Sequence, residues 1–76
     1  MMLSLSELEV GKEGTILTIQ GQEVFLGRLR QFGFIEGTKI RCIGIAPPGS
    51  PMLLGVRGTI LAIRRHECIG ISVVVP

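Results

Sequence analysis

The segment RLRQFGFIEGTK constrains this chain more than any other, because it ends a helix and starts a strand within a few residues. Phe25, Leu29 and Phe32 are spaced by four and then three residues, which places them on one face of a helix. Gly33 supplies the left-handed residue that commonly follows a helix, and Gly37 can supply a second positive φ in the next turn. The segment therefore predicts a helix joined tightly to a sheet.

The predicted helix covers Gln22–Phe32, and the two residues between the glycines, Phe34 and Ile35, are apolar. Such a pair can fix the angle between the helix and the strand that follows. Gly27 lies inside the helix, where glycine costs up to ~1 kcal/mol relative to alanine. Either another segment packs closely against Gly27, or the helix is weak.

Strand patterns surround this helix, and glycine stands at nearly every corner between them. A chain of 76 residues forms one domain, residues 1–76. We predict a mainly β (small α+β) fold, a closed or nearly closed five-stranded barrel with one inserted helix. The predicted strands are Thr15–Gln20, Thr38–Ala46, Met52–Val56, Thr59–Arg64 and Ile71–Val75.

Two local expectations complete the barrel. In the first ten residues, Ser4 and Glu7 have the spacing of a capping box, which predicts a short capped turn whose leucines pack on the barrel. In the first strand, alternation separates Ile16 from Leu17 and Ile19, and we expect the latter pair to face inward.

The composition disfavours several classes of function. A net charge of +2 with no Trp or Tyr supplies neither a strong basic surface nor stacking platforms, so nucleic-acid binding is disfavoured. No phosphate-binding glycine motif or nucleophile elbow occurs, and we expect no enzyme. No apolar run approaches the ~20 residues of a membrane span, and no signal peptide is recognisable, which predicts a cytoplasmic protein. Its abundant aliphatic residues allow a homo-oligomer.

One group of residues has metal-binding chemistry. His66, Glu67 and Cys68 are consecutive in the last third of the chain, and Cys42 is the other thiol. Imidazole and thiolate suit Zn or Fe, so a divalent transition metal is one interpretation. The other is that the cysteines are small core residues and His66 is a surface residue.

The order of several motifs resembles the ferrous iron transport protein A family, the FeoA-like domains. The likeness is carried by LSEL, GTILTIQG, RLRQFGFIEGTKI, APPGSP and TILAIRRHECIGISV, which together span nearly the whole chain. Two departures occur: the family's Pro-Gly turn is Glu36-Gly37 here, and its Gly-Asp-Pro arch is Gly49-Ser50-Pro51. Without the arch carboxylate, a polar contact shared by the family through this loop is in doubt.

The resemblance implies an SH3-like barrel and a small cytosolic, non-catalytic accessory of a membrane ferrous-iron transporter that has a GTP-binding part. Two alternatives remain: a metal-responsive regulator that uses His66 and Cys68, and a nucleic-acid-binding barrel. Candidate partner-binding residues are Arg28, Arg30, Phe34, Glu36, Pro48 and Ser50.

Overall fold

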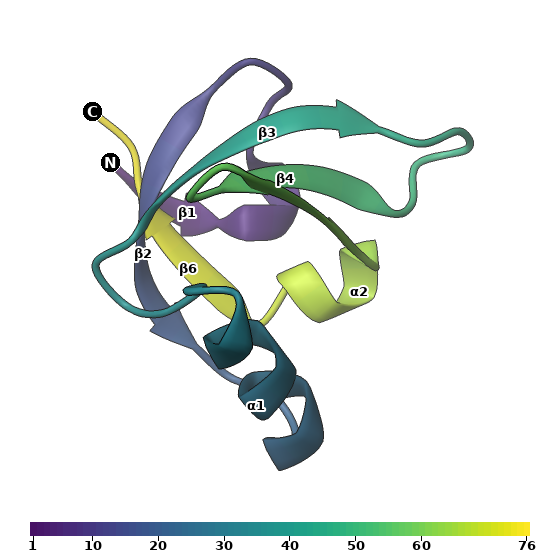
Figure 1. Cartoon of the computed structure of the whole chain (residues 1–76). Helices are drawn as coiled ribbons and strands as arrows, with labels where there is room; N and C mark the ends of the chain where they lie inside the picture. Colours follow the sequence, from purple (N-terminus) through teal and green to yellow (C-terminus); the bar gives the residue numbers. More distant parts are fainter.

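The computed structural model describes all residues, 1–76. Six strands, two α-helices and one 3-10 helix follow one another along the chain. Figure 1 shows their arrangement in space. Their bounds are β1 Met2–Ser4, η1 Leu5–Glu7, β2 Glu13–Ile19, α1 Glu23–Gln31, β3 Lys39–Ile45, β4 Met52–Val56, β5 Thr59–Ile63, α2 Arg65–Cys68 and β6 Ile71–Val74. The predicted mainly β fold with a helix between its first long strands is confirmed.

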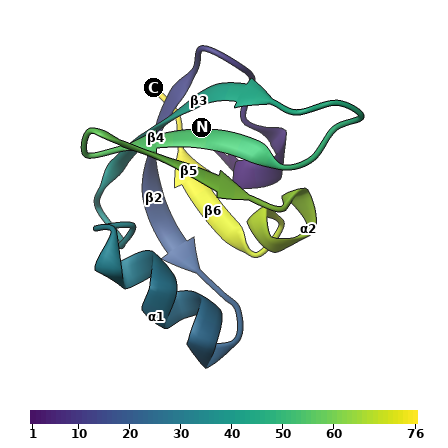
Figure 2. The ribbon, with the colours of Figure 1, turned by 45° about the vertical axis from the view of Figure 1, so that its right-hand side comes forward.

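The strands form one antiparallel sheet in the order β1-β6-β2-β3-β4-β5. The sheet curls around the core, and β2 lies beside both β3 and β6 (Figures 1 and 2). The chain ends lie together, because the amino group of Met1 donates to the carbonyl of Val75 at 2.8 Å. The two edges of the sheet are β1 and β5, so the barrel is partly open and each edge strand pairs on one side only.

The first segment was predicted as a turn but also contributes a sixth strand. Met2–Ser4 pairs with β6, and this long-range pairing has no local sequence signal. The capping box is confirmed, since Ser4 and Glu7 make reciprocal hydrogen bonds at the two ends of η1. Leu5 and Leu8 are buried, as expected for a turn that closes one side of the core.

The predicted inward face of the first strand was wrong for Leu17 and right for Ile19. Ile16 is buried, whereas Leu17 is 43% exposed. The cause is a β-bulge: Ile16 pairs with Val73 and Thr18 with Ser72, so Leu17 has no partner and turns outward. After the bulge Ile19 packs against the core. A bulge depends on the partner strand, so simple alternation did not predict it.

The core consists of 14 apolar side chains with no buried polar or charged residue. Every strand longer than β1 contributes to it, and α1 contributes only Leu29. Burial of each large aliphatic or aromatic side chain stabilises the fold by roughly 1.5–3 kcal/mol. Leu29 is the one fully buried residue of α1, and the half-buried Phe25 also packs against the core.

Candidate protein-docking site

The C-terminal end of α1 is a complete Schellman motif. The amide of Phe34 donates to the carbonyl of Leu29 and the amide of Gly33 to that of Arg30, both at 3.0 Å. Gly33 has φ +77°, in the left-handed region that glycine adopts without strain. Phe34 and Leu29, the two residues joined by the longer hydrogen-bonded loop of the motif, are both buried. The position of α1 is therefore fixed at this end.

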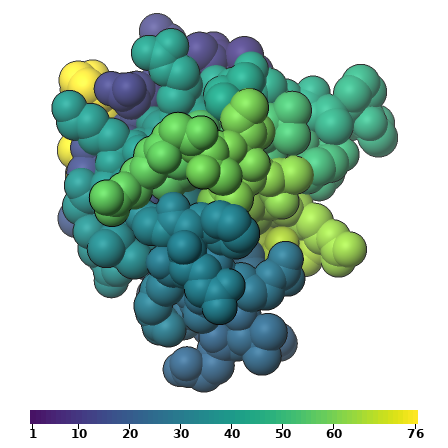
Figure 3. All heavy atoms as spheres, viewed as in Figure 1, coloured from purple at the N-terminus to yellow at the C-terminus, as the bar shows by residue number.

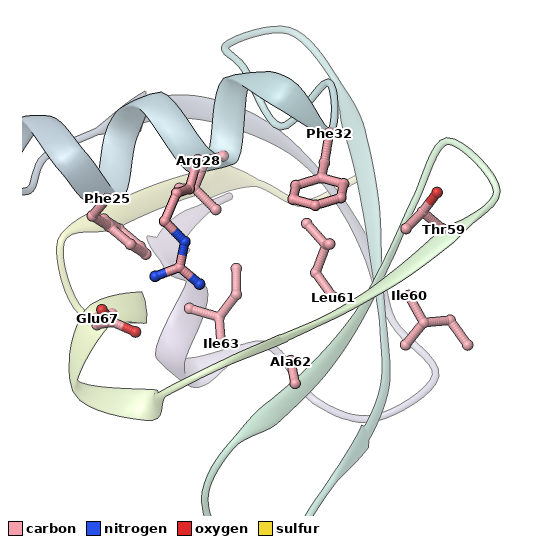
Figure 4. A pocket seen from close by; sticks show the side chains of 10 residues that line it. Phe25, Arg28, Phe32, Thr59, Ile60, Leu61, Ala62, Ile63 and Glu67 are labelled. Carbon is pink, nitrogen blue, oxygen red and sulfur yellow. The ribbon is translucent and has the colours of Figure 1, made fainter.

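Between α1 and β5 lies an open groove of about 290 Å³. Figure 4 shows Phe25, Arg28 and Phe32 facing the groove from the helix, and Leu61 and Ile63 facing it from the strand. Seven of its ten lining residues are hydrophobic. An apolar groove with a few polar groups at its ends suits a peptide segment or an apolar side chain of another protein.

The predicted stripe of Phe25, Leu29 and Phe32 does share one face of the helix, and all three residues line the groove. Leu29 reaches the core, Phe25 is half-buried, and Phe32 is 48% exposed. The stripe thus forms both the attachment of the helix and one wall of the groove.

Charged groups stand near both ends of the groove. At one end Arg28 extends from α1 toward Glu67 of α2 (Figure 4). At the other, Arg57 of the β4–β5 turn lies against the end of α1: a Cβ added at Gly33 would be 2.6 Å from Cδ of Arg57. The wall between these ends is β5, whose second edge has no partner strand. An unpaired edge offers backbone donors and acceptors to an extended segment.

The sequence-predicted partner residues do not form one site. Arg28 lies in the groove, whereas Arg30 and Glu36 line a smaller hollow of about 120 Å³ on another side of the helix. Phe34 was wrongly proposed as a surface residue. It is fully buried, because the Schellman motif turns its side chain onto the core.

Pro48 and Ser50 belong to the arch between β3 and β4, which projects from the barrel away from α1 (Figure 1). Oγ of Ser50 accepts a hydrogen bond from the amide of Arg65 at 3.1 Å and so satisfies the first turn of α2. The guanidinium of Arg65 donates to the carbonyls of Gly49 at 3.3 Å and Ser6 at 2.9 Å. Ser50 is therefore engaged in holding the arch.

The four candidate metal ligands differ in how far they are exposed to solvent. His66 is exposed and Glu67 is half-buried, while Cys42 and Cys68 are buried free thiols. Burial raises the pKa of Cys68 to about 12, with a further contribution from Glu67, and burial also raises the pKa of Cys42. Both thiols are then protonated near neutral pH, and the thiolate is the metal ligand. No group of three or more His, Cys, Asp or Glu side chains is placed to hold a metal ion.

Sequence reasoning missed the strand side of the groove. Leu61 and Ile63 read as ordinary strand residues, and nothing local shows that β5 is an edge that faces the helix. The sequence analysis also did not predict that Phe32 is half exposed. Its place at the very end of the predicted helix could have indicated this. None of the helices is long and apolar enough to span a membrane.

The fold and the groove define a small SH3-like β-barrel with an exposed apolar groove between a helix and an edge strand. A family model described as the FeoA domain matches residues 3–75. The chain belongs to the FeoA domain family, as the resemblance predicted.

Relatives of known description agree. The chain is 30% identical over 71 residues to an Fe(2+) transport protein A/Fe(2+) transporter FeoB fusion protein of Porphyromonas gingivalis (strain ATCC BAA-308 / W83), and the match covers 93% of this chain and 8% of that relative. The chain thus spans a small part of that curated relative's length.

Two solved structures share the fold at comparable identity. The solution structure of FeoA from Chlorobium tepidum has a TM-score of 0.93 at 30% identity, with 96% of this chain and 70% of that chain covered. A zinc complex of Stenotrophomonas maltophilia FeoA, described as an SH3-domain protein, has a TM-score of 0.80 at 29% identity, with 93% and 88% covered.

Proposed function

We propose that this chain is a non-catalytic accessory of ferrous-iron uptake, which binds a ferrous-iron transporter on the cytoplasmic side through the groove between α1 and β5. The observation that carries the proposal is the groove itself, an apolar channel beside an unpaired strand edge in a member of the FeoA family. Fusion of a homologous segment to the transporter FeoB in the P. gingivalis protein supports this choice of partner.

The lining residues suggest how the groove binds. Phe32 is 48% exposed at its rim, and an exposed aromatic residue beside apolar walls is a common anchor in protein interfaces. Arg28 adds a donor for a carboxylate or a backbone carbonyl of the bound segment. A segment of the transporter with one or two apolar side chains and an acidic residue would match both features. Its GTP-binding part is the first region to test.

The proposal is tested by calorimetric titration of the chain onto the full-length transporter and, separately, onto its GTP-binding part, with and without nucleotide and Fe²⁺. Phe32→Ala is expected to weaken binding about 30-fold or more, since truncated anchor residues cost about 2 kcal/mol. Arg28→Glu should weaken binding through charge reversal.

The matched control is Val24→Ala on the same helix. Val24 is 76% exposed and does not line the groove, so its truncation should leave affinity unchanged. Equal losses for Phe32→Ala and Val24→Ala would move the docking face elsewhere. If the chain bound the full-length transporter in none of these conditions, the proposed partner would be refuted.

A further inference from the structure

An outer face of the sheet, which borders the groove at Thr59 and Ile60, combines cations with exposed aliphatic side chains. It is formed by β3, β4 and β5, and we define this outer basic face by Lys39, Arg41, Arg57, Ile43 and Ile60, which line one shallow surface depression. Ile60 lines both this depression and the groove, and Figure 4 shows its side chain on the opposite side of β5 from that of Leu61. In Figure 3 the green β4–β5 segment lies on the near face of the molecule, above the blue helix.

Strand register brings these residues together. Arg41 pairs with Gly55, and Gly55 pairs with Ile60, so the three lie in one row across the sheet. The side chain of Ile43 lies over Gly55, because a Cβ added there would be 2.9 Å from Cδ1 of Ile43. A glycine at this position therefore lets the two isoleucines approach each other across β4.

The two isoleucines remain accessible: Ile43 is 43% exposed and Ile60 is 63% exposed. Moving these exposed apolar side chains from water into a less polar phase breaks no contact with the rest of the protein. The transfer removes apolar surface from water and is therefore favourable. The outer basic face therefore has an apolar centre.

The charge around this centre is mainly positive. Three cations, Lys39, Arg41 and Arg57, lie with a single carboxylate, Glu13, which faces Arg41 across the β2–β3 pair. Arg65 is the only arginine whose side chain donates hydrogen bonds to other residues of the chain. The guanidinium groups of Arg41 and Arg57 therefore keep their donors for an external anion.

We propose that the outer basic face binds weakly to the surface of a bilayer that contains anionic lipids, with Ile43 and Ile60 inserted at the interface. Such a surface attracts basic residues and accepts apolar side chains between headgroups. All three Phe lie elsewhere, two in the groove and one in the core, so this face lacks the aromatic anchors expected of a protein interface. This inference does not depend on the proposed partner.

The experiment is co-sedimentation of the full chain with vesicles of phosphatidylcholine, with or without phosphatidylglycerol. Binding is expected only to the anionic vesicles and should weaken as salt is raised. Arg41→Ala should lower the partition coefficient about fivefold, since each basic residue near an anionic surface contributes about that factor. The charge-matched control, Arg30→Ala on α1, should leave the partition coefficient unchanged.

A second pair of variants tests insertion. Ile60→Ser should lower partitioning about fivefold or more. The control Ile69→Ser alters a residue of nearly equal exposure, 65%, outside this face, and should have no effect. All four variants change exposed side chains, and circular dichroism verifies that each one folds.

Three results would overturn the proposal: no sedimentation with anionic vesicles, equal binding to both kinds of vesicle, or equal losses for a variant and its control. A chain that binds soluble polyglutamate with the same dependence on Arg41, but does not bind vesicles, would instead assign the face to an acidic protein.

Discussion

Two glycines of the helical segment are expected to respond to alanine in opposite ways. At Gly27, no atom of another segment lies within 4 Å of an added Cβ. The structure therefore decides between the two interpretations of this residue: nothing packs there and the helix is weak. Gly27→Ala should then raise the free energy of unfolding by up to ~1 kcal/mol.

At Gly33, alanine meets two obstacles. Its φ of +77° costs an L-residue about 1–2 kcal/mol, and the added Cβ would be 2.6 Å from Cδ of Arg57. The two variants should differ by about 2–3 kcal/mol, which in a domain of this size separates their melting temperatures by about 10–20 °C. Because the chain has no Trp or Tyr, urea and thermal unfolding are best followed by circular dichroism.

A double-mutant cycle separates the two obstacles at Gly33. Arg57→Ala removes the side chain that the new Cβ would meet, so the pair Gly33→Ala/Arg57→Ala should recover the steric part of the loss and keep the backbone part. If Gly33→Ala were as stable as the parent chain, or if Gly27→Ala destabilised it, the account of how α1 ends and what it contacts would be wrong.

Three further outcomes are expected. Phe34→Ala should destabilise the chain by about 3–5 kcal/mol, whereas Phe32→Ala, half exposed, should cost less than about 1 kcal/mol; urea unfolding distinguishes them. The pKa of Cys68 is about 12 in the folded chain, against an ordinary value of 9.0. Its protonated thiol therefore contributes to stability below pH 9, and this contribution should be lost as the pH rises toward 12. Urea unfolding at several pH values measures the loss. Ser50→Ala and Arg65→Ala should each cost about 1 kcal/mol and combine non-additively in thermal melts, because both side chains hold the arch; additive losses would count against that coupling.

Local chemistry made much of the fold predictable. Gly33 and Gly37 both have positive φ, and the strand Met52–Val56 begins and ends where its apolar run does. The interpretation of Phe34 as an apolar clip between helix and strand agrees with its burial, and its second role as a contact residue does not. One local pattern supported both interpretations, and only the packing of the Schellman motif on the core distinguished them.

The remaining errors arise from contacts between distant segments. The bulge at Leu17 and the pairing of Met2–Ser4 depend on β6, the last strand of the chain. The groove depends on β5 lying opposite α1, although about thirty positions separate their apolar residues in the sequence. The hydrophobic pattern of the sequence indicates whether a segment is helix or strand and where it ends. It does not indicate which strand lies at the edge of the sheet.

The attachment of α1 relates this architecture to binding. At its C-terminal end the helix is held by the Schellman motif and by buried Leu29, and Arg57 packs against that end. At its N-terminal end, Gln22 makes no capping hydrogen bond through its side chain, and Gly27 weakens the middle. The C-terminal end of α1, near Phe32, is therefore held by more backbone hydrogen bonds than the N-terminal end. If the groove binds the transporter as proposed, Phe32 would give the bound segment its most firmly held contact.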